Sequence, residues 1–481
     1  MAYPFANKKS NFSEDKKKSS RFNLLPVSVA LFCAAGLISV SNSVNAAPVG
    51  GVVASGKANI ISSSKNLKIN QISDKAVINW KDFSIKSDEV VTFNQPSASS
   101  VVLNRVKGNF KSIIDGGLNA NGRVFLINPH GVIFGATAKV NVGGLVATTS
   151  DISNKDFMAG RYEFGIAGDS DALIINKGSI TAAEGGLVAF VAPGVINSGV
   201  INARLGRISL ASGDRFTVDF YGDNLIQLAL SADKVEQLVG TKDDISNTGI
   251  LQADGGVVSL SVGSASQVVD QVINMSGVIQ AQSVGMKNGK IILNAGASGQ
   301  VDVAGILDVS GSENSTAGSI NVLGKQVILR EGAELSASSG MAGGEILVGG
   351  NFQGKGEELN AQQTIVESGA QLSANAEVQG DGGKVIIWSD NSTHFSGDIV
   401  AKGKGEGSRG GFVEISGKQQ LSYNGTVDVR AESGEQGTVL FDPDAILISN
   451  AAGDDGANNG SVSFSETTTA EPWQVTPEQL D

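Results

Sequence analysis

A repeated pair of short motifs is the feature that most constrains how this chain can fold. The first motif is Asn-x-Gly followed by β-branched or apolar residues, and regular copies begin at Asn176, Asn197 and Asn247. Six less regular copies follow, with their glycines at Gly277, Gly305, Gly332, Gly369, Gly397 and Gly425. Four of the five separations between these glycines are 27 or 28 residues, and the other is 37. The second motif is Gly followed by an apolar strand, as at Gly289, Gly344, Gly383 and Gly411.

Strands joined by glycine turns that return at a constant spacing predict a solenoid. In such a fold each coil of chain pairs its strands with those of the coil below, about 4.8 Å away. Inward Val, Ile and Leu form a continuous core, and Gly or Asn takes the corners that need a positive φ. One coil cannot bury its apolar face alone, so the coils are stable only as a stack. We therefore expect an all-β chain, with a right-handed parallel β-helix over residues 166–440.

Composition supports short strands and opposes the other fold classes. The chain has 62 Gly but only 9 Pro, and 17% of its residues are charged. Disordered chains have the reverse balance of low hydrophobicity and high charge. The best helical stretch, Leu225 to Val239, is short. A β-sandwich or propeller is the alternative, but such folds have strands of more even length and more aromatic residues.

The first 46 residues have the pattern of a signal peptide. A basic segment precedes an apolar run from Leu24 to Val40, and small residues place the cleavage site between Ala46 and Ala47. A membrane anchor is the alternative, although a run of 17 residues containing Pro26 is at the lower limit for spanning a bilayer. A lipoprotein signal at Cys33 is not expected, because bulky Phe32 precedes it.

Cys33 is the only cysteine, so the mature chain has no thiol although it is exported to an oxidising compartment. Either a large core needs no disulfides, or a disulfide would close a loop that blocks a narrow export pore. The second explanation predicts a chain that crosses the outer membrane unfolded. Loss of the leader leaves 30 basic and 46 acidic residues, a net charge of −16. This charge argues against nucleic acid or anionic lipid as a partner.

Four segments carry a resemblance to a known family. They are Ile78–Phe83, Leu103–Val106, Asn121–Val132 and Val142–Ala147. In order and spacing they resemble the secretion domain of the filamentous haemagglutinins and high-molecular-weight adhesins, which are exoproteins of two-partner secretion. The family turn is usually Asn-Pro-Asn-Gly, whereas His130 is the third residue here. Since His and Asn both tolerate unusual backbone angles, and Pro129 and Gly131 suit a type I turn, we expect the turn to persist.

The resemblance implies an organisation and a function. Residues 47–165 would be the two-partner secretion domain, capping the β-helix of residues 166–440, and 441–481 a tail. Because family members are usually much longer, we expect a truncated chain. The protein would be a secreted or surface-exposed adhesin of a Gram-negative bacterium, exported through a partner outer-membrane β-barrel transporter. It would attach to an unidentified receptor on host cells or other bacteria. The residues implied in transporter recognition are Asn128, Pro129, His130 and Gly131, with Asn104 and Arg105 as candidates that could equally cap the helix.

Catalysis and cofactors are not expected. After the leader the chain has two histidines, His130 and His394, which is too few for a multi-His zinc site and makes a Ser-His-Asp triad unexpected. A β-helix polysaccharide lyase or hydrolase would need two carboxylates facing one groove. Neighbouring acids such as Glu357 and Glu358 would point to opposite faces of a strand. A carrier of a contact-dependent toxin or a haemolysin on the same secretion route is a further alternative, and a toxin would require a C-terminal effector domain.

Overall fold

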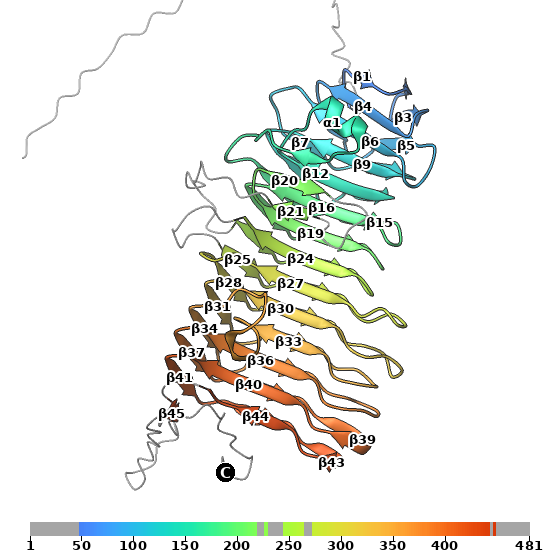
Figure 1. Cartoon of the computed structure of the whole chain (residues 1–481). Helices are drawn as coiled ribbons and strands as arrows, with labels where there is room; N and C mark the ends of the chain where they lie inside the picture. The colour runs from blue at the N-terminus through green and yellow to red at the C-terminus, as the bar shows by residue number, and fades with distance from the viewer. Residues whose placement is uncertain (1–47, 219–225, 229–243, 264–271, 443–445, 449–481) are drawn as a thin grey trace, which may run out of the picture. The chain divides into compact units, whose positions relative to one another are not determined.

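Three long sheets of short strands make up the fold (Figure 1). The structure, a computed structural model, describes residues 48–218, 226–228, 244–263, 272–442 and 446–448. The expected signal peptide, including Ala46 and Ala47, lies outside the described residues, as does most of the expected tail. Among the described residues, no helix is long and apolar enough to cross a membrane.

Between Val101 and Asp428, each coil of chain contributes one strand to each sheet, in the order first, second, third. The first sheet has 14 strands: β1 (Val52–Ser55), β4 (Lys75–Trp80), β6 (Val101–Val106), β9 (Arg123–Ile127), β12 (Gly144–Thr148), β16 (Leu187–Ala192), β19 (Arg207–Ser212), β24 (Val257–Val262), β27 (Lys290–Asn294), β30 (Ser319–Leu323), β33 (Glu345–Val348), β36 (Lys384–Ser389), β40 (Phe412–Gly417) and β44 (Thr438–Leu440). The second sheet has 12 strands: β7 (Ser112–Ile114), β10 (Val132–Phe134), β14 (Leu173–Asn176), β17 (Gly194–Asn197), β22 (Ile245–Asn247), β25 (Val272–Met275), β28 (Gln300–Val303), β31 (Gln326–Leu329), β34 (Gln363–Val366), β37 (Ser392–Phe395), β41 (Gln420–Tyr423) and β45 (Ile446–Ile448). The third sheet has 14 strands: β2 (Ala58–Ser62), β3 (Asn66–Gln71), β5 (Val90–Asn94), β8 (Gly117–Ala120), β11 (Lys139–Val142), β15 (Ser179–Ala182), β18 (Val200–Asn202), β23 (Ile250–Gln252), β26 (Val278–Gln280), β29 (Ile306–Asp308), β32 (Glu334–Ser336), β35 (Gln371–Ser373), β38 (Asp398–Val400) and β42 (Thr426–Asp428).

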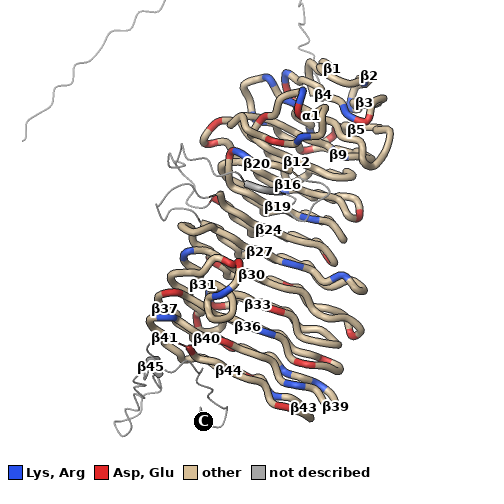
Figure 2. The backbone as a smooth tube through the Cα atoms, in the orientation of Figure 1, with Lys and Arg blue, Asp and Glu red and all other residues tan. Residues whose placement is uncertain are grey.

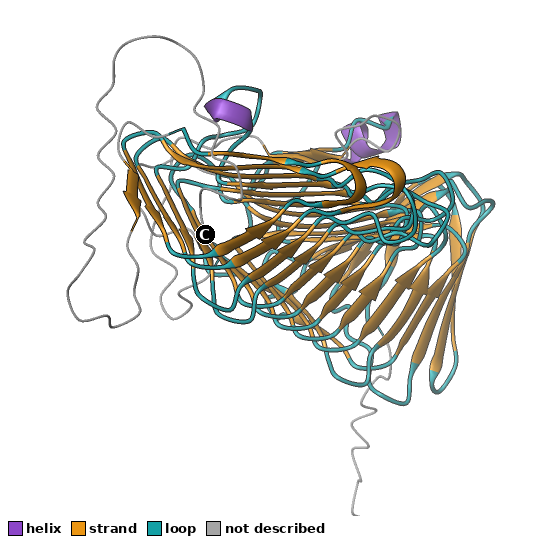
Figure 3. Ribbon diagram, turned by 90° about the horizontal axis from the view of Figure 1, so that it is seen from below, coloured by secondary structure: helices purple, strands orange, loops and turns teal. Residues whose placement is uncertain are grey.

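Neighbouring strands pair in parallel, except at the N-terminal end of the stack. There β1 pairs antiparallel with β4, and β2 antiparallel with β3. Elsewhere the register keeps apolar residues above one another, as with Ile245, Ile273 and Val301, which are fully buried. Figure 3 shows the strands of successive coils lying over one another. The stacked inward side chains form one continuous core.

The Asn-x-Gly motif spans the corner between the second and third sheets. The buried amides of Asn176, Asn197 and Asn247 form a ladder, with Nδ2 of Asn176 donating to Oδ1 of Asn197 at 2.8 Å and Nδ2 of Asn197 to Oδ1 of Asn247 at 2.7 Å. The glycines stack beside them, and a Cβ on Gly249 would lie 2.2 Å from the carbonyl oxygen of Gly199. The motif therefore satisfies buried polar groups and permits close stacking.

Several elements lie outside the three sheets. The helix α1 (Asn154–Ala159) is capped by Ser153, and β13 (Glu163–Phe164), β20 (Phe216–Val218) and β21 (Ile226–Leu228) form a small antiparallel sheet. Their aromatic residues pack on outward residues of the first sheet in a second apolar cluster that includes Phe125 and Phe157. Further along the chain lie the 3₁₀ turn η1 (Phe352–Gly354) and a pair of strands, β39 (Gly403–Arg409) and β43 (Ala431–Glu435).

The predicted all-β parallel β-helix is confirmed, with two differences in detail. Between Val101 and Asp428, each coil has three strands in these sheets where the motifs suggested two, because Asn-x-Gly covers the end of one strand and the start of the next. Within the stretch from Leu225 to Val239, Ile226–Leu228 forms a strand and not a helix, and the rest lies outside the described residues. The strand β45 lies beyond residue 440 and pairs with β41, and the end of the repeats at that residue stays a prediction.

Candidate functional site

The predicted turn at Asn128 joins β9 to β10. The backbone N–H of Gly131 donates to the carbonyl oxygen of Asn128 at 3.0 Å, which closes a four-residue turn. Gly131 has φ +107°, and a Cβ there would lie 2.6 Å from the carbonyl oxygen of Leu173. Among described non-glycine residues only Leu205 and Gln353 have positive φ, so His130 needs no unusual backbone angle. The replacement of the family's Asn by His130 is compatible with the turn for this reason.

The side chain of Asn128 points inward and is fully buried. Its Nδ2 donates to the carbonyl oxygen of Phe110 at 3.0 Å and to Oγ of Ser112 at 2.9 Å. Its Oδ1 accepts the backbone N–H of His130 at 3.0 Å. Through these bonds Asn128 connects the turn to Phe110 and to Ser112, the first residue of β7. An Ala variant would lose all three bonds.

A second connection holds the turn from the other side. Nδ1 of His130 lies 2.6 Å from Oδ2 of Asp169, and the backbone N–H of Asp169 donates to the carbonyl oxygen of Pro129 at 3.0 Å. Both side chains are partly exposed, at 29% for His130 and 49% for Asp169. The turn is therefore held by two distant residues. Phe110 lies 18 residues before Asn128, and Asp169 lies 39 residues after His130.

Asn104 and Arg105 on β6 lie one coil before the turn, because Arg105 is in register with Ile127. Both side chains are buried. Oδ1 of Asn104 accepts the indole N–H of Trp80 at 2.9 Å. Arg105 donates to Oδ1 of Asp151 at 2.7 Å, to Oδ1 of Asn154 at 2.6 Å and to the carbonyl oxygen of Ile152. Arg105 thus holds the start of α1 against the first sheet.

The two motif segments therefore meet on neighbouring coils, with the side chains of Asn104, Arg105 and Asn128 buried. Comparison with known proteins shows the family of the chain that carries them. A family model described as the TPS secretion domain matches residues 45–309, more than half of the chain. The chain belongs to the TPS secretion domain family. Its predicted membership of two-partner secretion is confirmed, and the exoproteins of this route are secreted.

Three proteins similar to this TPS domain come from Haemophilus influenzae. A heme/hemopexin-binding protein of strain ATCC 51907 / DSM 11121 / KW20 / Rd is 35% identical over 256 residues, which are 52% of this chain and 27% of that protein. A second heme/hemopexin-binding protein is 32% identical over 262 residues, 48% of this chain and 26% of that one. The crystal structure of the HMW1 secretion domain has 31% identity and a TM-score of 0.69, covering 82% of this chain and all of that one. This chain spans about a quarter of the length of the two heme/hemopexin-binding relatives.

The match to residue 309 reaches beyond the boundary predicted at residue 165. The first sheet also continues without a break across that boundary, since β12 pairs with β16 in register from Leu145 and Val188. The division of the TPS domain from the stalk at residues 165–166 stays a prediction. The role of Asn104, Arg105 and the Asn128 turn in recognition also stays a prediction.

Sequence reasoning missed two residues at the edge of the TPS domain's turn. Phe110, whose carbonyl oxygen Asn128 binds, is 81% exposed, and Ile113 on β7 is 46% exposed. The signal that could have found Phe110 is an aromatic residue within a polar Gly-Asn-Phe-Lys turn, in a chain with only 5% aromatic residues. With Asn104, Arg105 and Asn128 buried, Phe110 and Ile113 are the exposed large apolar side chains of the site, beside the partly exposed His130 and Asp169.

Proposed function

We propose that a cognate outer-membrane β-barrel transporter recognises this chain at the surface formed by Phe110, Ile113, Pro129 and His130. Membership of the TPS family supports a transporter partner. The observation that carries the choice of surface is the bond from the buried amide of Asn128 to the carbonyl oxygen of Phe110, whose ring is 81% exposed. Asn128 acts as a positioning residue, and Phe110 makes the contact.

Exposed aromatic residues suit this role, because truncation of a central aromatic contact typically weakens protein binding by about 2 kcal/mol or more. Asn128 differs, since its loss leaves buried polar groups unpaired and weakens the fold itself. The two residues are therefore expected to affect export through different physical causes.

The test compares Phe110→Ala with Asn128→Ala in cells that express the transporter. Phe110→Ala should keep the melting temperature of the mature protein and reduce both release into the medium and affinity for the transporter's periplasmic part by at least about tenfold. Asn128→Ala should lower the melting temperature as well as release. Val378→Ala, at a side chain 53% exposed on a distant coil, is the matched control. Normal release of Phe110→Ala would contradict the proposed surface.

We further propose that the exported β-helix attaches the bacterium to host cells or to other bacteria. A stack of coils offers a long surface to extracellular partners, and its net negative charge favours solubility. Purified mature protein coupled to beads should bind such cells, and beads carrying heat-unfolded protein should not. Equal binding by both beads would contradict the attachment role.

Binding of heme or hemopexin is the second candidate, favoured by the names of the two relatives and their identity of 32–35% with this chain. Titration with hemin and capture on immobilised hemopexin test it directly. Saturable binding of either, together with no attachment to cells, would favour this function over attachment.

A further inference from the structure

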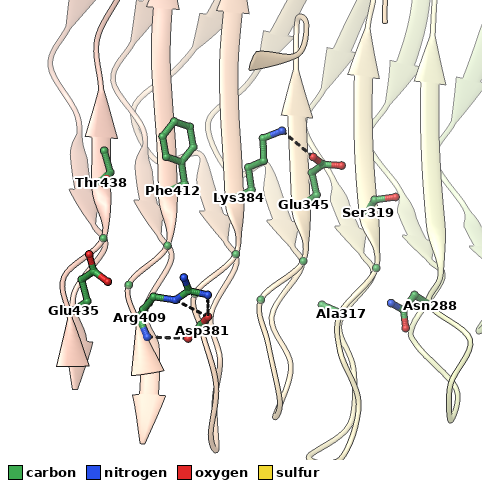
Figure 4. Close-up of a pocket in the computed structure, with 18 of the residues that line it drawn as sticks. Asn288, Ala317, Ser319, Glu345, Asp381, Lys384, Arg409, Phe412, Glu435 and Thr438 are labelled. Atoms are coloured by element: carbon green, nitrogen blue, oxygen red, sulfur yellow. Dashed lines mark hydrogen bonds and ion pairs between the residues drawn. The ribbon is translucent and has the colours of Figure 1, made fainter. Parts of the chain in front are cut away.

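A groove of about 740 Å³ crosses six successive coils where strands of the first sheet begin (Figure 4). Directly before its first-sheet strand, each coil places a glycine in the corner of the groove: Gly289, Gly318, Gly344, Gly383, Gly411 and Gly437. These glycines stack so closely that a Cβ on Gly344 would lie 2.1 Å from the carbonyl oxygen of Gly318. Stacking of the coils therefore explains the glycines, and the row of glycines forms the floor of a channel along this corner.

Charged side chains of both signs line the channel. The basic and acidic residues are equal in number: Lys290, Lys384 and Arg409 against Glu345, Asp381 and Glu435. Nζ of Lys384 lies 3.1 Å from Oε1 of Glu345, and Arg409 binds Asp381 through its guanidinium at 2.7 Å and its backbone N–H at 2.8 Å. Figure 2 shows the same interspersion of basic and acidic residues along the chain. The groove is thus strongly polar but has no net charge.

This lining excludes several classes of partner. Five of the six strands at the groove are paired on both sides, as β36 is with β33 and β40, and only the terminal strand β44 has one partner, β40. A peptide could therefore add a strand only at that end of the sheet and not along the groove. Apart from glycine, only Ala317 and Phe412 supply an apolar surface, which is too little for an amphipathic helix. Nucleic acid needs an excess of basic residues, which the balanced charges do not provide.

We infer that the groove binds an extended, neutral oligosaccharide. A sugar hydroxyl donates one hydrogen bond and accepts two, and so it can pair with both the carboxylates and the basic groups of the lining. Phe412, packed edge-on against Phe352 with ring centroids 5.6 Å apart, offers a ring against which the apolar face of a pyranose can lie. This inference rests on the proposed attachment function and names the class of receptor that the stalk would hold.

The geometry also sets the length of ligand that the groove can hold. Six coils at about 4.8 Å each span about 24 Å from first to last, close to the length of five pyranose units in an extended chain.

Glycoside hydrolysis requires a carboxylic acid that stays protonated. Hydrogen bonds from the backbone and side chain of Arg409 lower the pKa of Asp381, which keeps it ionised. Asp381 is therefore not suited to donate the proton that cleavage of a glycosidic bond needs.

The test is calorimetric titration of the mature full chain with three neutral hexasaccharides, of β-1,4-linked glucose, β-1,4-linked N-acetylglucosamine and β-1,4-linked mannose. At least one should bind with a Kd below about 1 mM. Affinity should rise with chain length up to about five units and then level off. Arg409→Gln should weaken binding about tenfold, because a charge-assisted donor is lost. Lys418→Gln, at an exposed lysine on the turn after β40, is the control and should bind as the wild type does.

Three outcomes would overturn the inference. They are no binding by any of the three sugars, binding of a charged hexamer of galacturonate alone, or equal affinity of Arg409→Gln and wild type. Cell attachment separates this failure from failure of the proposed function. If wild type and Arg409→Gln attach equally well, the groove is not the receptor site although attachment stands. If wild type binds a hexasaccharide and attaches to no cell, attachment is wrong and the groove stands.

Discussion

The carboxyl group of Glu414 on β40 is fully buried. Burial disfavours the charged form of a carboxyl group. Burial raises its pKa from 4.5 to about 7, against the effect of hydrogen bonds from the backbone N–H of Gln353 and from Ser416. Asp442 raises the pKa further, and Lys384 lowers it. The folded state thus holds this proton more tightly than the unfolded chain does.

Stability should therefore depend on pH through Glu414. Its contribution is fully present below pH 4.5, falls as the pH rises towards 7, and is lost above that, for a total of about 3 kcal/mol. In Glu414→Gln this dependence should disappear, so the variant should match the wild type at pH 4.5 and exceed it at pH 8. Denaturant unfolding at both pH values measures the effect. An identical change with pH in both proteins would contradict the assignment.

The asparagine ladder gives a second prediction for a single residue. Asn197 is its middle member, and Asn197→Ala leaves a donor of Asn176 and an acceptor of Asn247 unpaired inside the stack. We expect the free energy of unfolding to fall by about 2–5 kcal/mol. Asn202→Ala, at a partly buried position whose contact with Gln252 measures 3.4 Å, is the control and should cost under about 1 kcal/mol. Similar losses in both variants would show that the ladder has no special role.

At the scale of elements, the stacking of coils depends on glycine at the start of first-sheet strands. Gly344→Ala would force a methyl group against the carbonyl oxygen of Gly318 and should separate β30 from β33. Gly165→Ala is a matched control, because a Cβ there meets nothing within 4 Å. The first variant should lose several kcal/mol of stability and the second less than about 0.5 kcal/mol. Equal melting temperatures would contradict the close stacking.

The sequence predicted the strands well because a repeated coil repeats its motif. Gly289, Gly344, Gly383 and Gly411 each directly precede a strand of the first sheet, as the second motif implied. The helix α1 was missed because its six residues are too few for a helical period. The antiparallel strands β1 and β2 were missed because they lie at the N-terminal end of the stack and are not part of the repeated motif.

The candidate site was predictable only in part, for a similar reason. The turn Asn128–Gly131 is local, and its Asn-Pro and Gly residues were recognisable in the chain. The contact of Asn128 with Phe110 and that of His130 with Asp169 join residues 18 and 39 apart. Only the stacking of coils brings such residues together, so the accessible part of the surface could not be recognised before the fold was known.

At the scale of the whole molecule, the absence of cysteine after Cys33 leads to a prediction about export. Ser209 and Ser259 are in register on β19 and β24 and face the same side of the first sheet. A disulfide between cysteines placed there has a suitable strand spacing and would close a loop of about 50 residues. If the chain crosses the membrane unfolded, Ser209→Cys with Ser259→Cys should remain in the periplasm, and a reductant should restore release. Each single variant should be released normally, and full release of the oxidised double variant would exclude unfolded passage.

The most direct test of the central claim is the release of this chain in the presence and absence of a partner transporter. The chain and its cognate outer-membrane β-barrel protein would be expressed together, or the chain alone, and the mature protein quantified in medium and periplasm. We predict that release requires the transporter and that the chain expressed alone stays in the periplasm. Equal amounts in the medium under both conditions would contradict two-partner secretion of this protein.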